Sequence, residues 1–541
     1  MEKKSIRRRE IEQVYGKISP FELKDKLISY AKETKVSGTH SLLDAGRGNP
    51  NWTAAAPREA YYLFGQFAVA ETRNTWHDGD LAGMPQKEGI YKRFMEFLNT
   101  HSDQAGVQLL SDIVHYGINV RGFKPEAWVY ELTDAMIGDN YPYPDRMLTH
   151  VEKVVLDYLV HEVGYLTESE NPMKIYAVEG ATAAMCYVFD SLIANNIFAK
   201  GDKIALMTPI FTPYLEIPHL PRYEFEVIEI VANEVDKNGN NTWQFPDSEI
   251  DKLKDPEIRA LFIVNPSNPP STAMRNETID YLSEIVRTHN PHLMIISDDV
   301  YGTFVDGFKS LMSALPYNTI GVYSYSKYYG VTGWRLGTIA LHENNVFDYL
   351  LGNLDDSRLE RSRRRYSALS VTPDDIQFID RVVADSRQVA LNHTAGLSTP
   401  QQVMMAFFSI FSLLPAGKVY KEQTKAICRR RQRLLFDGLG LPVPENAHDA
   451  AYYTQFDLLQ WAKQNYPADF SAYLQANYSP VDVLLRLAEA SSIILLSGGG
   501  FSGPEWSIRV SLANLKDEMY SKIGSVLKLI LEQYVTEWQS Q

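Results

Sequence analysis

Residues 324–337, SYSKYYGVTGWRLG, place a lysine and an arginine among hydroxyl groups and glycines. Lysine is the side chain that forms a Schiff base with an aldehyde, and a desolvated lysine can also act as a base. Arg335 carries the planar fork of donors that suits a phosphate group. Ser324 and Ser326 flank Lys327 and complete the candidate cofactor-binding set of this segment. In isolation, a glycine-rich surface loop with one exposed lysine is the structural alternative.

Two further polar clusters follow apolar runs. Asp298 ends the run LMIISDD, where an unpaired buried carboxylate would be costly. A pyridinium nitrogen would be a suitable partner, because the carboxylate keeps it protonated and strengthens an electron sink. Tyr301 follows three residues later, and Asn268 lies in the proline-rich turn NPSNPPST, so both could reach a phenolate oxygen of the same cofactor. An aspartate that caps the next turn is the structural alternative.

An anion site and a carboxylate site complete the set. After the run KIYAVEG, Gly180, Ala181 and Thr182 open a predicted helix, whose N-terminal N–H groups and dipole favour a phosphate. Arg509 stands inside the apolar pattern WSIRVSLAN, so its charge needs a carboxylate partner. The α-carboxylate of a substrate would serve, and so would an aspartate or glutamate of the protein.

The candidate residues fall at the ends of short β-branched runs that helical stretches separate. The runs are KIYAVEG, KIALMTP, RALFIVNP, LMIISDD and TIGVYSYSK. This alternation predicts an α/β fold with a mainly parallel sheet and helices on both faces. Ligands of such sheets bind beyond the carboxyl ends of the strands, where these residues lie. The runs AYYTQFDL and WSIRVSLAN predict a second, smaller α/β domain.

Composition narrows the class of protein. The chain has 541 residues and a formal net charge of −14, so it is a poor candidate for binding nucleic acid or an anionic membrane surface. Its two cysteines, Cys186 and Cys428, predict no metal site and no disulfide framework, which favours a cytoplasmic location. The longest apolar run, residues 403–417, is too short to span a bilayer and predicts a buried helix.

The order and spacing of these clusters resemble the pyridoxal-phosphate-dependent enzymes of fold type I, the aspartate aminotransferase superfamily, from about residue 140 to 515. The resemblance implies that Lys327 holds pyridoxal 5′-phosphate as a Schiff base and moves protons at the substrate. It further implies that Arg335 binds the phosphate, Asp298 pairs with the pyridine nitrogen, Tyr301 and Asn268 flank the phenolate oxygen, and Arg509 binds the substrate α-carboxylate.

Three more positions follow from the same resemblance. Phe211, in TPIFTPY, falls where the family stacks an aromatic ring on the cofactor. Tyr141 or Tyr143, in DNYPYPDR, resembles a tyrosine that reaches the phosphate of the neighbouring subunit's cofactor, and the spacing does not choose between them. Ser271 departs from the glycine usual in the family, which affects a turn and removes no catalytic group.

Over nearly its whole length the chain resembles one branch of the superfamily, the bacterial aspartate 4-decarboxylases. The resemblance rests on the segment LDAGRGNPNW and on extra length in residues 57–130 and 341–395. It implies β-decarboxylation of L-aspartate to L-alanine and carbon dioxide through a ketimine and an enamine, with aminotransferase side activity. Arg47 and Gly48 are then candidates for closing over the substrate. A loop arginine with a structural partner is the alternative for Arg47.

Two other functions are consistent with parts of the pattern. An aminotransferase for aspartate or a related amino acid shares every step up to the ketimine, so the cofactor-binding residues do not separate it from a decarboxylase. A non-catalytic relative would be expected to lack the lysine or the acid that activates the ring. Both Lys327 and Asp298 are present.

The predicted organisation has four parts. Residues 1–56 form an N-terminal arm, 57–135 a helical insertion, 136–400 a large cofactor-binding domain with a further insertion at 341–395, and 401–541 the C-terminal part of a small domain. The basic strip 358–365 and the helical additions favour contacts beyond a dimer. A solvated helix face and an anion site are the alternatives for the basic run 358–367. The resemblance implies a homo-oligomer built from dimers, a dodecamer.

Overall fold

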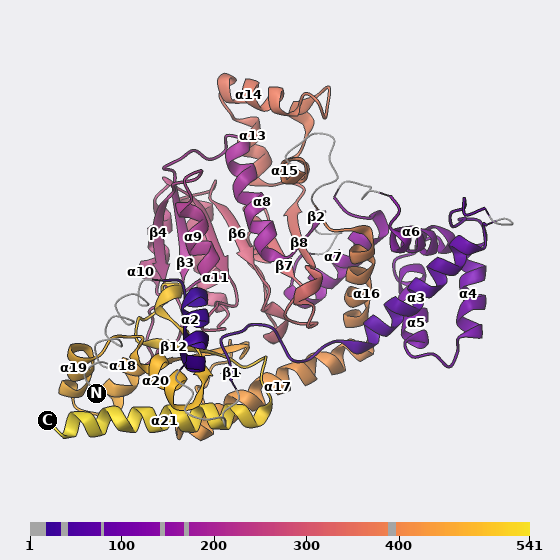
Figure 1. The fold of residues 1–541 in the computed structure, drawn as a ribbon. Helices are drawn as coiled ribbons and strands as arrows, with labels where there is room; N and C mark the ends of the chain where they lie inside the picture. The colour runs from indigo at the N-terminus through magenta and orange to yellow at the C-terminus, as the bar shows by residue number, and fades with distance from the viewer. Residues whose placement is uncertain (1–17, 34–41, 77–79, 141–145, 167–171, 388–395) are drawn as a thin grey trace.

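A seven-stranded sheet lies at the centre of the computed structural model, which describes residues 18–33, 42–76, 80–140, 146–166, 172–387 and 396–541 (Figure 1). The strand order is β2–β8–β7–β6–β5–β3–β4. β8 runs antiparallel to both neighbours, and the other adjacent pairs are parallel. The strands are β2 (Met173–Val178), β3 (Lys203–Thr208), β4 (Glu226–Val231), β5 (Ile258–Val264), β6 (Met294–Asp298), β7 (Thr319–Ser324) and β8 (Gly337–His342).

Both faces of this sheet are buried, as the continuous apolar runs predict. Alternate residues of β5 enter two separate cores: Phe262 joins the larger one, and Leu261 joins the smaller one. On the first face Phe189 of α8 (Ala181–Ala194) stacks on Phe262 at 4.4 Å between ring centroids. On the second face Leu282 of α11 (Asn276–Thr288) packs in the core of Leu261, beside α10 (Asp247–Ile250) and α12 (Leu311–Ala314). The predicted α/β class is confirmed.

The parallel strands bring their carboxyl ends to one edge of the sheet. Asp298 pairs in register with Val264 of β5 and with Val322 of β7, so the last residues of β5 and β6 lie side by side, next to a residue near the end of β7. The loops that follow these strands carry Asn268, Tyr301 and Lys327. Backbone pairing therefore places residues that are distant in sequence around one point.

A smaller sheet forms beside that edge. Its order is β11–β12–β9, all antiparallel, with bounds Leu496–Ser497, Ser507–Ser511 and Tyr453–Asp457. The N-terminal segment joins this unit, because β1 (Leu43–Asp44) pairs with β10 (Ile493–Ile494). Two long helices, α17 (Pro415–Leu439) and α21 (Asp517–Gln539), pack together along its outer side (Figure 1). The remaining helices of this unit are α18 (Leu458–Asn465), α19 (Ala468–Asn477) and α20 (Asp482–Ser491).

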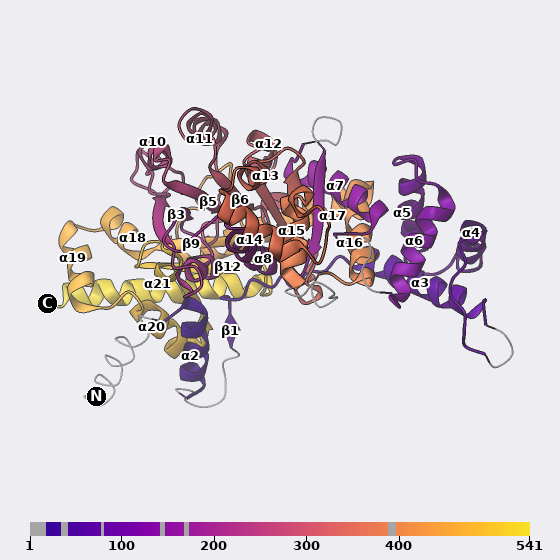
Figure 2. The ribbon, with the colours of Figure 1, turned by 90° about the horizontal axis from the view of Figure 1, so that it is seen from above.

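The first described helix, α2 (Pro20–Glu33), also belongs to this side of the molecule. It packs against α20 and the short strands β10 and β11 (Figure 2). Leu23 and Leu27 are buried on its inner face. This placement brings the ring of Phe21 to the edge of the large sheet, where it meets Phe211 and Phe501.

A group of helices projects from the opposite side of the large sheet (Figures 1 and 2). Its members are α3 (Ala55–Arg73), α4 (Ile90–Thr100), α5 (Val107–Asn119) and α6 (Pro125–Ile137). α7 (Thr149–Val163) and the buried α16 (Thr399–Leu413) connect the group to the sheet. Within the described ranges no single helix is long and apolar enough to cross a membrane, and the pair α16 and α17, bent by 88°, passes that test by length and composition only.

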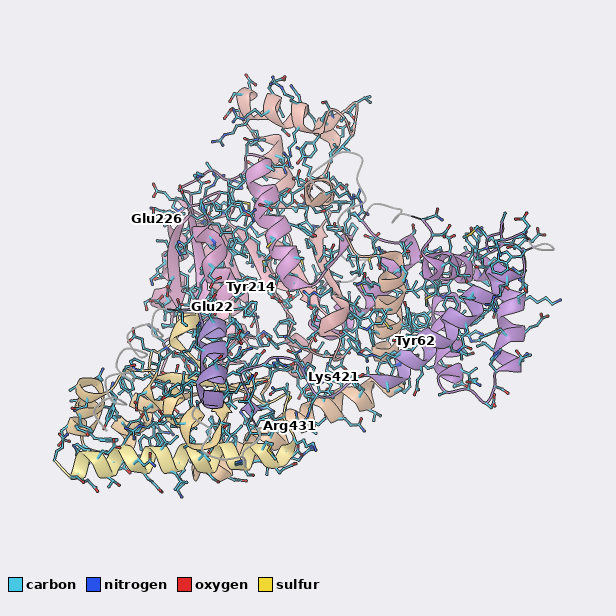
Figure 3. The ribbon with its side chains drawn as sticks, in the orientation of Figure 1. Glu22, Tyr62, Tyr214, Glu226, Lys421 and Arg431 are labelled. Carbon is cyan, nitrogen blue, oxygen red and sulfur yellow. The ribbon has the colours of Figure 1, made fainter. Side chains whose placement is uncertain are left out.

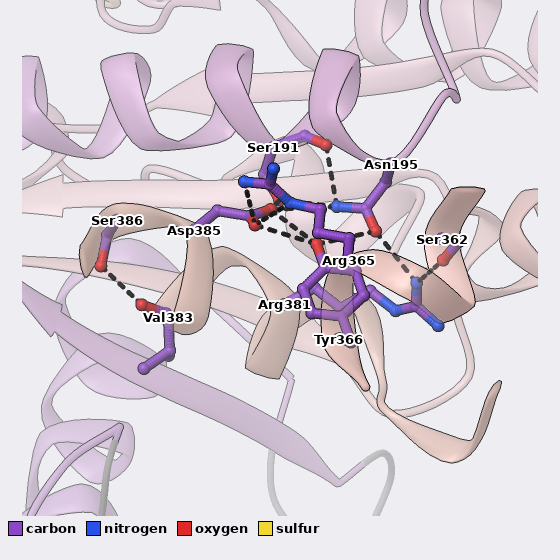
Figure 4. A network of polar contacts seen from close by, with 9 residues as sticks. All are labelled: Ser191, Asn195, Ser362, Arg365, Tyr366, Arg381, Val383, Asp385 and Ser386. Atoms are coloured by element: carbon purple, nitrogen blue, oxygen red, sulfur yellow. Dashed lines mark hydrogen bonds and ion pairs between the residues drawn. The ribbon is translucent and has the colours of Figure 1, made fainter. Parts of the chain in front are cut away.

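A polar network fixes the insertion that follows β8. The insertion contains α13 (Val346–Gly352), α14 (Asp356–Tyr366) and α15 (Phe378–Arg387). Asp385 of α15 is buried and accepts hydrogen bonds from Ser191, Asn195, Arg365 and Tyr366, so it joins α14 to the C-terminal end of α8 (Figure 4). A buried carboxylate of this kind is stable only while its donors remain in place.

We predict that Asp385→Ala lowers the free energy of unfolding by about 3–5 kcal/mol, because it leaves buried donors without their acceptor. Asp374→Ala is the matched control, since Asp374 pairs with Arg363 at the surface of the same insertion. An exposed pair is screened by water, so this control should change stability little. Urea unfolding followed by circular dichroism measures both, and equal losses would contradict the role of the network.

Candidate active site

A cavity of about 280 Å³ opens at the carboxyl edge of the large sheet, against the small sheet and α2. Residues from both sheets, from the loop after β1 and from α2 line it. They are Phe21, Gly48, Asn49, Ala181, Thr182, Phe211, Tyr214, Val264, Asn268, Asp298, Val300, Tyr301, Ser324, Ser326, Lys327, Thr332, Arg335, Tyr453 and Arg509. Most of the residues predicted to bind a cofactor or substrate are therefore in one place.

Lys327 is half-buried and points its amine into this cavity. Its Nζ donates weakly to the carbonyl oxygen of Gly48 at 3.5 Å, and Tyr452 Oη donates to the same oxygen at 2.7 Å. A Cβ atom on Gly48 would lie 3.1 Å from Lys327 Nζ and 2.4 Å from Tyr453 Oη. Glycine at this position therefore keeps space open beside the amine, which supports the predicted place of Gly48 in the site.

Asp298 lies at the end of β6 with its carboxylate on the cavity wall. Burial raises the pKa of Asp298 to about 6, while the hydrogen bonds from Tyr214 Oη at 2.7 Å and from the N–H of Val300 act in the opposite direction. Tyr214 lies in the short helix α9 (Thr212–Glu216), near α2 in the view of Figure 3. A cationic partner in the cavity would favour the charged carboxylate.

The start of α8 forms a cradle for an anion. Gly180 has a φ of +88°, and a Cβ atom there would lie 2.5 Å from Arg335 Nη2, so the turn requires glycine. Arg335 adopts left-handed backbone geometry with a φ of +57°. Its guanidinium donates to the carbonyl oxygens of Thr332 and Glu179, both at 2.9 Å, which leave its charge unneutralised. Ala181 and Thr182 bring the first N–H groups of the helix to the same wall.

Arg509 is fully buried on β12, the central strand of the small sheet. It donates to Asn268 Oδ1 at 3.0 Å and to the carbonyl oxygen of Gly46 at 2.7 Å, and it lies over the ring of Tyr453 at 4.2 Å. The structure shows no ion pair between Arg509 and a carboxylate of the described residues, and its buried Nε has no hydrogen-bond partner. Burial lowers the pKa of Arg509, so an anion in the cavity would stabilise its charge.

These observations fit pyridoxal phosphate. The cavity has an amine at one side, a basic cradle with free helix N–H groups, and a carboxylate at the end of β6. Asn268 and Tyr301 are buried on its wall and supply an amide and a phenol, both of which can donate a hydrogen bond. The predicted residues that share the wall also include Ser324 and Ser326, whose hydroxyls are 2.9 Å apart. Phe211 meets Tyr214 edge-on at 5.5 Å.

Arg47 and the tyrosines of DNYPYPDR differ from the residues above. Arg47 does not line the cavity among the described residues; its exposed guanidinium pairs with Asp44 at 3.3 Å, which matches the structural alternative. Its role in closing over a substrate stays a prediction. Tyr141 and Tyr143 lie outside the described residues.

The sequence predictions omitted seven residues of the cavity wall: Phe21, Asn49, Tyr214, Val264, Val300, Thr332 and Tyr453. Tyr214 had a local signal, because it follows Phe211 by three residues in TPIFTPY. Tyr453 lies in the strand-like run AYYTQFDL, where the burial pattern alone marks it as core. Phe21 reaches the cavity only through the packing of α2, which no local pattern reports.

We predict that Lys327→Ala abolishes the long-wavelength absorbance that pyridoxal phosphate gives when it is joined to a protein lysine. The variant removes the amine in the cavity and keeps the anion cradle, so it should still bind the cofactor without a covalent bond. Lys463→Ala, at an exposed position on α18, is the control and should retain the absorbance. Absorbance retained by Lys327→Ala would refute the assignment.

We predict that Tyr214→Phe raises the pKa of Asp298, because it removes a hydrogen bond that favours the carboxylate. A protonated ring nitrogen needs the charged form of Asp298, so affinity of the apoprotein for pyridoxal phosphate should fall as pH drops through about 6. In the variant this fall should begin at a higher pH. Equilibrium dialysis from pH 5 to 8 measures it, with Tyr281→Phe, which bonds Asp251 on the far side of the sheet, as control. Superimposable profiles for Tyr214→Phe and the unchanged protein would contradict the prediction.

The chain is similar to known proteins over most of its length. Residues 119–526 match the model of the family Aminotransferase class I and II. The chain is 43% identical to the Bifunctional aspartate aminotransferase and L-aspartate beta-decarboxylase of a Pseudomonas species, over 97% of each chain. It is 23% identical to an aspartate aminotransferase of Pyrococcus horikoshii over 45% of this chain and 61% of that one.

Solved structures share the fold at lower identity. The aspartate aminotransferase from Thermus thermophilus with maleate superposes with a TM-score of 0.58 and 16% identity, covering 94% of this chain and 96% of that chain. Bna3p, a putative kynurenine aminotransferase from Saccharomyces cerevisiae, gives a TM-score of 0.59 at 16% identity, covering 95% and 96%. The family match and the near full-length relative agree, and the chain belongs to the class I and II aminotransferase family.

Proposed function

We propose that this protein is a pyridoxal-phosphate-dependent aspartate 4-decarboxylase, which converts L-aspartate to L-alanine and carbon dioxide and also has aspartate aminotransferase activity. The observation that carries an amino-acid substrate is Arg509, a buried guanidinium that lines the cavity and contacts neutral acceptors. Support for the reaction comes from the Pseudomonas relative, whose name joins the two activities and whose similarity covers 97% of both chains.

Different residues on the cavity wall would bind different groups of the cofactor. Bound pyridoxal phosphate would supply an aldehyde for Lys327 and a ring that accepts electrons. Arg335 and the first N–H groups of α8 would hold the phosphate. Asp298 would keep the ring nitrogen protonated. Asn268 and Tyr301 would donate to the phenolate oxygen.

Substrate positioning falls to Arg509 and proton transfer to Lys327. Arg509 would bind the α-carboxylate through its planar donors, and Asn268 holds one edge of that guanidinium at 3.0 Å. Once the substrate has displaced it, the free amine of Lys327 would remove the α-proton and later return a proton. A positioned base of this kind contributes roughly 10²–10⁴-fold to the rate. Gly48 leaves space beside this amine, because a Cβ atom there would lie 3.1 Å from Lys327 Nζ.

The fate of the side-chain carboxylate separates the two reactions. As the carbon–carbon bond breaks, the side-chain carboxylate becomes neutral carbon dioxide and the electron pair stays with the substrate. A tight ion pair to this carboxylate would therefore oppose decarboxylation. Three cations line the described wall of the cavity, and each has another proposed partner, since Lys327 joins the cofactor, Arg335 binds the phosphate and Arg509 binds the α-carboxylate. This allocation favours decarboxylation. Arg47 remains our candidate for closing over the substrate from the loop after β1.

An aspartate aminotransferase is the second candidate. It would use the same residues up to the point where water attacks, and the Pyrococcus relative bears that name. The outcome then depends on water reaching the substrate carbon. Phe21 and Phe211, whose ring centroids lie 6.0 Å apart at the wall, would limit that access.

We predict that the purified protein, given pyridoxal phosphate, L-aspartate and 2-oxoglutarate as the amino acceptor, releases carbon dioxide and alanine in equal amounts with a smaller amount of oxaloacetate. Gas release, chromatography of amino acids and a keto-acid assay measure the three products in one incubation. The Lys327→Ala protein is the control for uncatalysed loss of carbon dioxide. Oxaloacetate formed without carbon dioxide would overturn the decarboxylase and leave the aminotransferase.

Two further expectations belong to this proposal. The protein would work as a homo-oligomer built from dimers, with a dodecamer as the state implied by its resemblance to bacterial decarboxylases. It would act in the cytoplasm. Light scattering of the purified protein measures the first.

A further inference from the structure

Tyr453 stands where the cofactor side and the substrate side of the cavity meet. It is the first residue of β9 and is buried, with 2% of its surface exposed. Its hydroxyl lies 3.1 Å from Tyr301 Oη, and its ring lies under the guanidinium of Arg509 at 4.2 Å. The hydroxyl also borders the space beside Gly48 that Lys327 Nζ faces. One side chain therefore touches the predicted donor to the cofactor and the predicted binder of the substrate.

Ser271 fixes the position of Tyr453. Its φ is +61°, a left-handed geometry that glycine would adopt with less strain. The serine hydroxyl accepts a hydrogen bond from the N–H of Tyr453 at 2.8 Å, and the serine carbonyl accepts one from Ala450 at 2.7 Å. The turn that carries Asn268 is thereby joined to the strand that carries Tyr453. The side chain of Ser271 thus makes a contact that glycine could not make.

The direction of the hydrogen bond between Tyr301 and Tyr453 depends on whether Tyr301 also donates to a cofactor. Each phenol has one proton, and Tyr301 donates to Tyr453 in the structure. If Tyr301 turns its proton to the phenolate oxygen of a cofactor, it can no longer donate to Tyr453. The contact is then kept only if Tyr453 becomes the donor and Tyr301 the acceptor. The result is a chain of two donors that ends on the cofactor oxygen.

We propose that Tyr453 is a positioning residue that acts through two neighbours: its hydroxyl strengthens the donor Tyr301, and its ring seats Arg509. The proposal rests on the cofactor assignment made under the proposed function, and it adds a link between cofactor and substrate sites. Hydrogen bonds in a chain polarise one another, so a donor behind Tyr301 makes Tyr301 the better donor. Ser271 holds Tyr453 in position for these hydrogen bonds, because its hydroxyl accepts from the N–H of Tyr453.

The chain has a consequence for the group that joins Lys327 to the cofactor. A donor to the phenolate oxygen stabilises negative charge there and weakens the hold of that oxygen on the imine proton. Tyr453 should therefore lower the pKa of the imine nitrogen. The titratable and charged groups that share the cavity wall with Lys327 are Asp298, Tyr214, Tyr301, Tyr453, Arg335 and Arg509, and Tyr452 contacts the same carbonyl oxygen of Gly48. Tyr453→Phe changes one of these hydroxyls and leaves every charge in place.

The test is a spectroscopic pH titration of the holoenzyme without substrate. In Tyr453→Phe the pKa of the imine should rise by roughly 0.1–0.7 unit, which is the effect of losing 10–30% of a charge-assisted hydrogen bond. The KM for aspartate should change little, because the phenyl ring still seats Arg509. Tyr453→Leu removes both functions, so it should raise the imine pKa and the KM together. A shift below 0.1 unit, or a downward shift, in Tyr453→Phe would overturn the proposal.

Two more variants provide an independent test and a control for this titration. Ser271→Gly relieves the backbone and removes the acceptor of the Tyr453 N–H, so it should raise the imine pKa by a smaller amount. If Tyr453→Phe does not take up the cofactor, Ser271→Gly becomes the test of the proposal. An imine pKa that is unchanged in Ser271→Gly would then overturn the proposal. Tyr325→Phe is the control, since Tyr325 is buried, bonds Ser409 and does not line the cavity; it should leave the titration unchanged. Because no substrate is present, an upward shift would stand even if aspartate released no carbon dioxide.

Discussion

The buried charge of Arg509 is the constraint on which the arrangement of the site depends. A guanidinium removed from water is stable only with close acceptors, and here the arginine and its two acceptors come from three separate parts of the chain. β12 carries the arginine, the turn after β5 brings Asn268, and the loop after β1 brings the carbonyl oxygen of Gly46. The rings of Tyr453 and Phe501 add faces on which the cation can rest, at 4.2 and 5.0 Å. The neutral acceptors orient the charge without cancelling it, so the site retains its attraction for a carboxylate.

The two adjacent carboxylates at the end of β6 show how the same strand serves the site and the core. Burial raises the pKa of Asp298 to about 6 and that of Asp299 to about 7. Asp298 faces the cavity, whereas Asp299 accepts hydrogen bonds from Ser297, Ser310 and Tyr165 away from it. Period-two alternation sends the side chains to opposite sides. One carboxylate is thus available to a ligand while the other fixes the loop that follows the strand.

The sequence allowed the strand ends and most of the site to be predicted because those signals are local. Apolar runs that end in polar clusters identified β5, β6 and β7, and the rule that ligands bind beyond such strands brought Asn268, Asp298 and Lys327 together. The antiparallel direction of β8 and the pairing of β1 with β10 have no local signal, since they depend on contacts between distant segments. Phe21 and Tyr453 were missed for the same reason. Ser271 was expected only to alter a turn, yet its hydroxyl anchors Tyr453.

The structure also explains how closely related reactions can share one cavity. Every cation on its described wall has a partner expected before the side-chain carboxylate of the substrate arrives, so that carboxylate meets little opposing charge. Whether a water molecule attacks instead would depend on packing at the cavity wall, to which α2 contributes Phe21 beside Phe211. Because α2 packs on α20 and the short strands near β12, the same unit that holds Arg509 also places Phe21. Under the proposed function, binding of the α-carboxylate and exclusion of water would therefore depend on one unit, and a change in its position relative to the large sheet would alter both together.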